Sequence, residues 1–272
     1  MKVLTVANQK GGVGKTTTAQ HVAVALVEAG QKVLVVDVDA QSNLTIASGI
    51  RLEDVQKSVY QVLVTRRYEM ADVIIKTSHG YDLAPADLDL VDADAQLRSN
   101  SSITRWDNLL RLALAPLADI YDWCVIDCPP SFGTMTTVAM QAADGVLIPV
   151  SAEAWPLKGS QRLFTFVEQM QVENPDLQVV GVLPTLVEAR NSSHQEVLAK
   201  MPAIFQGRTM AAAIPKSIHF QRAARTGENV FMRAPNSAGA KRYRDVAQLA
   251  MRVLEAEVTV RGRVQSPVGA AR

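Results

Sequence analysis

Residues 10–17 read Lys-Gly-Gly-Val-Gly-Lys-Thr-Thr, a glycine-rich segment with a lysine on either side of its glycines. Glycines in such a loop allow the backbone to turn several N–H groups toward one anion. The second lysine would reach the outer phosphate oxygens of a nucleoside triphosphate, and the hydroxyl of the next threonine would ligate Mg²⁺. The segment therefore predicts a triphosphate site formed by Gly11, Gly12, Val13, Gly14, Lys15, Thr16 and Thr17.

Two later apolar runs also end in carboxylates. Residues 123–127 read Trp-Cys-Val-Ile-Asp, and residues 35–39 read Val-Val-Asp-Val-Asp. An apolar strand that delivers one carboxylate, here Asp127, suits a nucleotide site because that group can hold Mg²⁺ through a coordinated water. Pro129 and Pro130 then end the strand. These runs supply the acidic partners that a magnesium-dependent phosphate site needs.

The elements that must position these residues alternate along the chain. The phosphate segment follows an apolar run with β-branched members and precedes an Ala-rich helical pattern that ends at Gly30. Strands are predicted at 2–7, 32–38, 80–85, 122–127, 145–150 and 179–184, with 209–214 as a further candidate. Helices are predicted at 15–29, 58–65, 103–118, 134–143, 157–173, 192–201 and 238–257.

This alternation predicts an α/β fold, a mostly parallel, doubly wound sheet with helices on both faces. Ligands of such sheets bind beyond the carboxyl ends of the strands. The phosphate loop, Asp37–Asp39 and Asp127–Pro130 all fall at such ends, so they should form one site. We expect a single domain over residues 1–257. Residues 258–272 lack periodicity and are expected to be a flexible tail.

Composition narrows the class of protein. The chain has 272 residues, 48% of them apolar and 20% charged, as in ordinary globular proteins. Its apolar amino-terminal run is broken too early for a signal peptide, and nothing approaches the roughly 20 apolar residues of a membrane span. Two cysteines favour a reducing cytoplasm. No zinc-binding spacing links the four histidines, which are His21, His79, His194 and His219.

Charge is distributed unevenly. Residues 1–189 contain 14 Lys and Arg against 22 Asp and Glu, whereas residues 190–272 contain 14 against 5. The two balances, −8 and +9, give the net charge of +1. Such segregation predicts a polyanion-binding face on the carboxyl-terminal third, with a merely solvated basic surface as the alternative.

The phosphate segment resembles a particular family. The common pattern has a glycine where this chain has Gln9, whereas Lys-Gly-Gly-Val-Gly-Lys-Thr-Thr resembles the deviant Walker A motif of the ParA/MinD superfamily of dimerising P-loop ATPases. The resemblance implies ATP and Mg²⁺ as ligands and a homodimer formed with ATP. In that family the first lysine, here Lys10, crosses the interface to touch nucleotide in the partner subunit. The alternative is that Lys10 is a surface lysine beside an ordinary phosphate loop.

The second acidic segment fits the same family. Residues 37–43 resemble its D-x-D-P-Q-G-N segment, with Ala40 and Ser42 where proline and glycine are common. The resemblance gives Asp39 the task of orienting the attacking water, and Asp37 a place near the Mg²⁺ shell. The implied catalytic residues are thus Lys10, Lys15 and Asp39, and the implied metal residues are Thr16, Asp37 and Asp127. A helix cap or turn residue is the alternative for Asp39.

The resemblance implies adenine rather than guanine as the base, and the N/T-K-x-D motif of guanine-binding relatives is missing from the sequence. In the family the base lies against the turns after the late strands. Here those turns correspond to Thr185 and to residues 214–216, with Pro215 as the expected contact.

The resemblance covers roughly residues 1–250 and fits the short ParA type, which has no amino-terminal helix-turn-helix. It implies a nucleoid-associated ATPase that binds double-stranded DNA without sequence preference when dimeric. A ParB-like partner on the cargo would stimulate hydrolysis and release the ATPase. His219 stands where a second arginine is usual, and a surface salt bridge is the alternative role for each arginine. The expected DNA contacts are Arg190, Lys216, His219, Arg222 and Arg225.

Three alternatives remain within the superfamily. The same ATPase cycle could position a protein cargo, such as a carboxysome or a chemosensory array, instead of a plasmid or chromosome. A MinD-like membrane ATPase would need a terminal amphipathic helix with bulky apolar residues, and residues 258–272 contain no Phe, Trp or Leu. A reductase resembling the nitrogenase iron protein would need cluster-binding cysteines on separate strands or loops, whereas Cys124 and Cys128 share one strand and its end.

Overall fold

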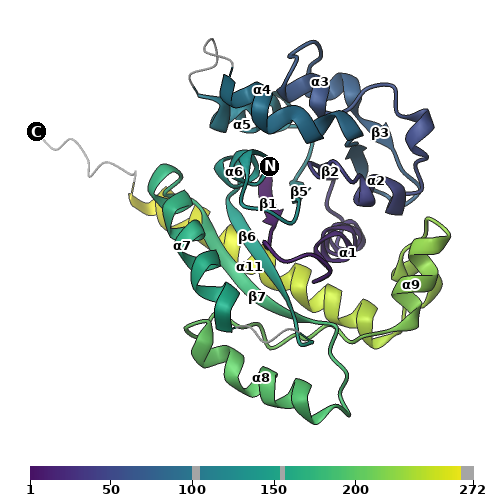
Figure 1. Cartoon of the computed structure of the whole chain (residues 1–272), viewed down its shortest axis with the longest axis vertical. Helices are drawn as coiled ribbons and strands as arrows, with labels where there is room; N and C mark the ends of the chain where they lie inside the picture. Colours follow the sequence, from purple (N-terminus) through teal and green to yellow (C-terminus); the bar gives the residue numbers. More distant parts are fainter. Residues whose placement is uncertain (100–104, 154–156, 265–272) are drawn as a thin grey trace, which may run out of the picture.

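The computed structural model describes residues 1–99, 105–153 and 157–264, and within them one sheet forms the centre of the molecule (Figure 1). Its strand order is β3-β4-β2-β5-β1-β6-β7. All neighbouring strands are parallel except β3, which runs antiparallel to β4 at the edge. The strands are β1 (Lys2–Val6), β2 (Val33–Asp37), β3 (Ile75–Lys76), β4 (Asp82–Ala84), β5 (Trp123–Asp127), β6 (Gly145–Ser151) and β7 (Gln178–Thr185).

Helices connect the strands and follow the last of them. The α-helices are α1 (Lys15–Glu28), α2 (Asn43–Ala47), α3 (Val59–Leu63), α4 (Ala93–Ser99), α5 (Leu109–Leu114), α6 (Thr134–Ala142), α7 (Leu157–Glu173), α8 (Ser192–Ile204), α9 (Ile218–Arg225), α10 (Val230–Arg233) and α11 (Ala238–Val264). Short 3₁₀ turns lie at Leu52–Asp54, Met70–Val73, Leu88–Asp92, Trp106–Asn108 and Ala115–Leu117.

The central strands are apolar on both sides, so a layer of helices covers each face of the sheet. On one face α1 and α11 lie side by side, and Val22, Leu26 and Val246 belong to the same buried cluster (Figure 1). On the other face α5, α6, α7 and α8 contribute to a second cluster that includes Leu110 and Val138. The predicted doubly wound, mostly parallel sheet is confirmed.

Two predicted elements are wrong in their details. Residues 209–214 form no strand; they run beside β7 with one isolated bridge, between Thr209 and Val182, and a second bridge just beyond the range joins Pro215 to Val187. The helix predicted at 103–118 is divided into two 3₁₀ turns around α5, and Pro116, which lacks an N–H donor, lies in the second turn. Residues 103 and 104 lie outside the described part of the chain.

The last helix also ends later than the predicted residue 257. Helix α11 continues to Val264, past residue 258, where the tail is predicted to start. A formed helix extends at the cost of ordering one residue per added hydrogen bond, so it can run past the end of its apolar stripe. The remainder of the predicted tail, 265–272, lies outside the described residues.

A buried histidine links α1 to the carboxyl-terminal helices. The Nδ1 atom of His21 lies 2.7 Å from the Thr17 carbonyl, and Nε2 accepts a hydrogen bond of 3.0 Å from the Val230 N–H. A carbonyl only accepts, so Nδ1 carries the proton and the ring is neutral. Its ring stacks on Tyr243 and meets Phe220 edge-on. Burial lowers the pKa of His21 to about 4.

This neutral histidine predicts a pH-dependent stability. The unfolded chain takes up a proton near the ordinary pKa of about 6.5, which the folded chain resists, so the free energy of unfolding falls as pH falls through that range. Between about pH 7.5 and about pH 5 this contribution is about 2 kcal/mol. Asp37, whose pKa burial raises to about 6, acts in the opposite direction. Between these two pH values, the free energy of unfolding measured by urea denaturation should therefore fall by about 2 kcal/mol less in His21→Phe than in the unmodified protein. An equal fall in both proteins would contradict the assignment of His21 as a buried neutral ring.

Candidate functional site

The phosphate loop joins the end of β1 to the start of α1. Gly12 and Gly14 have φ values of 71° and 84°, in the left-handed region where only glycine is unstrained. Gly14 is also the amino-terminal cap of α1, so the free N–H groups and the positive end of the helix dipole face the loop. This loop geometry suits an anion.

The two lysines of the loop have different surroundings. Lys15 is only 7% exposed, and its Nζ donates to the carbonyl oxygen of Lys10 at 3.1 Å. Burial lowers the pKa of the Lys15 ammonium, while the carboxylates of Asp127 and Asp39 oppose that shift. The Lys10 side chain is instead exposed. Lys15 thus faces the site of its own subunit, and Lys10 remains accessible from outside.

Asp127 lies at the centre of the site because of strand register. It pairs with Val6 of β1 on one side and with Asp37 of β2 on the other. Its Oδ2 accepts a hydrogen bond of 2.7 Å from the Thr16 hydroxyl. Its Oδ1 is buried and has no hydrogen-bond partner in the described part of the molecule. Burial, with the nearby charge of Asp37, raises the pKa of Asp127 well above its ordinary value.

The other two carboxylates have separate partners. Asp37 Oδ2 accepts from the Thr45 backbone N–H at 2.9 Å and from the Thr45 hydroxyl at 2.8 Å, so Asp37 fixes α2. Asp37 Oδ1 accepts from the Asp39 N–H at 3.1 Å. Asp39 Oδ1 accepts from the Gln41 N–H at 3.0 Å, which is the geometry of a turn residue. Ser42, not Asp39, occupies the amino-terminal cap position of α2, and its side chain makes no capping hydrogen bond there.

The residues fit a magnesium ion held in the manner of a nucleotide site. The orphaned Oδ1 of Asp127 is an acceptor that a metal-bound water would satisfy, and the Thr16 hydroxyl lies beside it. Mg²⁺ in such sites takes one or two protein ligands and completes its shell with water and phosphate. Residues 1–99, 105–153 and 157–264 contain no group of three or more His, Cys, Asp or Glu side chains able to hold a metal.

A cavity of about 430 Å³ adjoins the phosphate loop. Gly14 and Thr17 line it together with Thr185 and Pro215, so the segments predicted to meet the base do lie beside the loop. The Thr185 hydroxyl donates to the Val13 carbonyl at 2.8 Å and ties the end of β7 to the loop. Four other lining side chains, from three different segments, are not predicted as part of the site. Phe220 and Gln221 belong to α9, whereas Glu153 follows β6 and Tyr243 lies on α11.

The predicted DNA contacts do not share one environment. Arg190 is exposed between β7 and α8, and Arg222 and Arg225 are exposed in the last turn of α9. His219 is half-buried in the first turn of the same helix. Lys216 is different, since its Nζ lies 2.8 Å from Glu153 and 2.9 Å from Glu188. Two carboxylates thus already neutralise Lys216.

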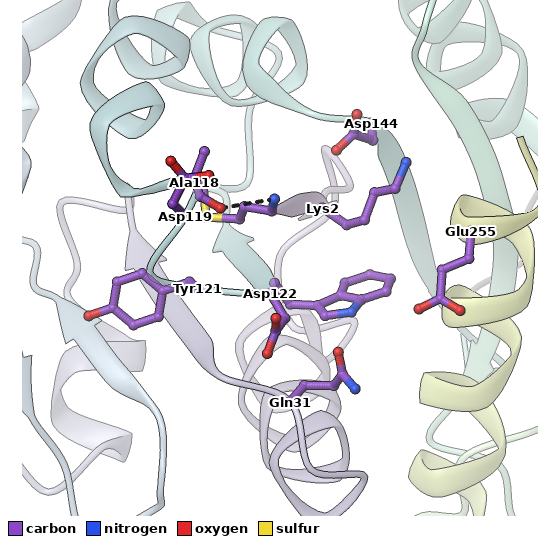
Figure 2. A pocket seen from close by; sticks show the side chains of 10 residues that line it. Lys2, Gln31, Ala118, Asp119, Tyr121, Asp122, Asp144 and Glu255 are labelled. Atoms are coloured by element: carbon purple, nitrogen blue, oxygen red, sulfur yellow. Dashed lines mark hydrogen bonds between the residues drawn. The ribbon is translucent and has the colours of Figure 1, made fainter. Parts of the chain in front are cut away.

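A second hollow, of about 340 Å³, lies at the opposite end of the sheet (Figure 2). It is lined at the amino ends of β1 and β5 by four acids, Asp119, Asp122, Asp144 and Glu255. Two of these acids already accept backbone hydrogen bonds, from Lys32 and from Val3. Acidic walls would repel a polyphosphate, so this hollow is not the nucleotide site.

Both cysteines are buried free thiols in one apolar cluster. Burial raises the pKa of Cys128 well above its ordinary value, so its thiol is protonated beside Asp127. Both therefore contribute to the core as small apolar side chains. None of the helices in the described ranges combines the length and the apolar character that crossing a bilayer requires.

The parallel sheet, the glycine loop between β1 and α1, and a carboxylate at the end of β5 define a P-loop nucleotide-binding protein. Comparison with known proteins narrows this class. A family model described as an AAA domain matches residues 1–179. The chain is 36% identical over 249 residues to the sporulation initiation inhibitor protein Soj of Bacillus subtilis, covering 91% of this chain and 97% of that protein.

Two further proteins are similar to this chain over most of its length. The chromosome-partitioning ATPase Soj of Thermus thermophilus is 36% identical over 255 residues, covering 93% of this chain and 97% of its own length. Cobyrinic acid a,c-diamide synthase from Mycobacterium smegmatis, solved with ADP and magnesium, has a TM-score of 0.82 and 33% identity, covering 94% of this chain and 96% of that one. The chain therefore belongs to the ParA-type family of partition ATPases. The Mycobacterium smegmatis protein is solved with ADP or an ATP analogue and magnesium, in agreement with the predicted ligands ATP and Mg²⁺.

Proposed function

We propose that the protein is an ATP-dependent dimer that binds DNA without sequence preference and partitions plasmid or chromosomal DNA with a ParB-like partner on the cargo. The observation that carries this proposal is the pair of lysines in the phosphate loop. Lys15 is buried in the site of its own subunit, whereas Lys10 is exposed and can reach another. The relative from Thermus thermophilus, a chromosome-partitioning ATPase, supports the choice of cargo.

Each residue of the site has a role in hydrolysis under this proposal. Lys15 and the loop N–H groups bind the phosphates of ATP. Thr16 and Asp127 hold Mg²⁺, with Asp37 behind them, and the bound ion neutralises charge on the phosphates. Asp39 accepts a hydrogen bond from the attacking water and aligns it. Thr185 and Pro215 border the adenine, in the cavity beside the loop.

Under this proposal the second subunit and the partner protein supply groups for hydrolysis that a single chain lacks. Lys10 of each subunit would complete the site of the other subunit, so that ATP closes a two-fold dimer. Among the described residues, none of the charged groups that shift the pKa of Lys15 or Asp127 is an arginine. An arginine is the side chain that would stabilise the transferring phosphoryl group. Slow hydrolysis by the protein alone, accelerated by DNA and the partner, follows from that.

A basic face would then bind the nucleic acid. Arg190, Arg222 and Arg225 are exposed and make no ion pair within the described residues, so their charge is available to phosphates. The half-buried His219 and the doubly paired Lys216 would contribute less. Pairing of the two basic faces in the dimer would make one continuous surface.

The decisive experiment measures binding to a non-specific duplex with no nucleotide, with ADP, and with ATP and Mg²⁺, over a series of salt concentrations. Tight, salt-sensitive binding with ATP alone is expected. Binding that ignores the nucleotide, or no binding at all, would overturn the proposal. Liposomes in the same assay test the membrane-bound alternative, for which no association is expected.

Removal of both arginines of α9 should weaken DNA binding through its electrostatic part. For Arg222→Ala with Arg225→Ala, the slope of log affinity against log salt should decrease by about 2 for each subunit, because each phosphate contact contributes about 0.9. ATP binding should not change. Arg51→Ala is the matched control, since Arg51 is exposed but already paired with Asp54 at 2.9 Å. An unaltered salt slope in the double variant would exclude α9 from the DNA interface.

A further inference from the structure

The connection between α9 and α10, Thr226–Asn229, joins the basic helix to the body of the protein. Three contacts fasten this connection and the residue after it to elements that lead directly from the nucleotide site. They come from α2, from the hairpin of β3 and β4, and from α1. Nothing in the proposed chemistry uses these contacts.

The first contact is between two backbones. Gly49, just after α2, and Gly227 have φ values of 80° and 65°, respectively. A Cβ atom on Gly227 would lie 3.0 Å from the Cα of Gly49, closer than ordinary van der Waals contact. Only glycine allows this approach. Because Asp37 anchors α2 through Thr45, the contact lies one short helix away from the acidic residues of the site.

The second contact is a buried hydrogen bond of fixed direction. The side chain of Asn229 caps α10, its Oδ1 accepting from the N–H groups of Phe231 and Met232. The amide nitrogen of Asn229 must therefore donate to Nδ1 of His79, at 2.7 Å. His79 is then neutral, and burial lowers its pKa against the opposing effect of the Gly227 and Ser48 carbonyls. One ring thus lies between the segment after α2 and the connection.

The third contact starts in the phosphate-binding segment. His21 receives the N–H of Val230, the first residue of α10, and its other ring nitrogen donates to the carbonyl of Thr17. Thr17 lines the cavity beside the phosphate loop. A chain of two hydrogen bonds therefore links the nucleotide cavity to the end of the connection.

We infer that the connection Thr226–Asn229 couples the nucleotide site to the basic helix α9, so that ATP binding changes the position of Arg222 and Arg225. This inference rests on the proposed function, of which it names the regulation. The close approach of Gly49 and Gly227 leaves no room for even a Cβ atom, so no flexible side chain lies between them to absorb a shift of α2 toward the connection. A displacement of the segment carrying Asp37 and Asp39 toward the connection would then push on Gly227.

The test compares substitutions that differ in space and not in backbone strain. Gly227→Ala places a methyl group against Gly49. Gly207→Ala is the matched control, because Gly207 has a φ of 75° and no heavy atom within 4 Å of its Cβ position. Asn229→Ser is a second variant, which retains a capping oxygen for α10 but removes the donor to His79. Thermal denaturation identifies any variant that does not fold, and at least one of the two test variants must remain folded with normal ATP binding.

Two readouts are needed. The first is the factor by which ATP strengthens DNA binding, expected to be about tenfold or more in the unmodified protein and in Gly207→Ala, and below about threefold in Gly227→Ala and Asn229→Ser. The second is hydrogen–deuterium exchange, in which ATP should change protection of residues 218–230 in the first two proteins only. The same ATP response in all four proteins would overturn the inference.

The two readouts also separate this inference from the proposed function. If the unmodified protein bound DNA equally with and without ATP, the proposed function would fail. The exchange measurement would still decide whether the nucleotide reaches α9 through this connection. A change in protection that survives in Gly227→Ala and Asn229→Ser would reject the coupling whatever the role of DNA.

Discussion

Lys15→Ala is expected to abolish ATP binding, with an affinity loss of about 100-fold or more. Two charge-assisted hydrogen bonds to phosphate oxygens, at about 1.5–3 kcal/mol each, account for that magnitude. The local charge adds to it, since Lys15 is buried beside Asp127 and Asp39. Without the lysine these carboxylates would face a polyphosphate with no cation between them. Calorimetric titration with ATP and Mg²⁺ measures the effect.

Lys10→Ala is the matched control, because Lys10 belongs to the same loop but its side chain is exposed. We expect this variant to bind ATP as a monomer and to lose the ATP-dependent dimer, as measured by analytical ultracentrifugation. Near-normal ATP affinity in Lys15→Ala would contradict the role of Lys15. An intact dimer in Lys10→Ala would remove Lys10 from the interface.

The sheet and the phosphate loop are predictable because they depend on local patterns. Each central strand is a continuous apolar run, and the six main strands agree with their predicted ranges to within a few residues at each end. Ligand loops of parallel sheets lie at the carboxyl ends of the strands. The strand pattern alone therefore places Lys15, Asp37 and Asp127 at this same end of the sheet. The pairing of Asp37 with Asp127 across β2 and β5 confirms that placement.

Helix α9 cannot be predicted in the same way. It is short, and its stability depends on tertiary packing of Phe220 against Tyr243 and on a cap from Ser217. The charges of Arg222 and Arg225 are visible in the sequence, but the helix that carries them is not. The cap before an apolar residue is the one local signal for it.

Long-range partners explain the remaining differences. Lys216 reads as a free cation in the sequence, yet Glu153 and Glu188 hold it after two different strands. Likewise His21 and His79 show no metal-binding spacing; buried hydrogen bonds instead connect His21 of α1 and His79 of the β3–β4 hairpin to the start of α10. Such roles depend on which distant segments meet, and a single sequence does not specify that.

Asp39→Ala is expected to slow hydrolysis by about 10²-fold or more while leaving ATP bound, because a side chain that positions the attacking water contributes at that level. The protein would accumulate as an ATP-bound dimer that stays on DNA. Single-turnover hydrolysis and the lifetime of the DNA complex, measured with the same preparation, check both parts. Asp39 makes no hydrogen bond to Thr16 or Lys15 in the described structure, so loss of its carboxylate need not weaken ATP binding.

Asp39→Asn separates this catalytic role from the structural one. Asparagine retains an oxygen that can accept from the Gln41 N–H, so the turn should persist, but it has lost the negative charge. We therefore expect the Asp39→Asn variant to hydrolyse ATP as slowly as the Asp39→Ala variant. If the Asp39→Asn variant instead hydrolysed ATP at the normal rate, Asp39 would be a turn residue only. If both variants failed to bind ATP, the carboxylate would belong to binding, and the water would have to be positioned by another group.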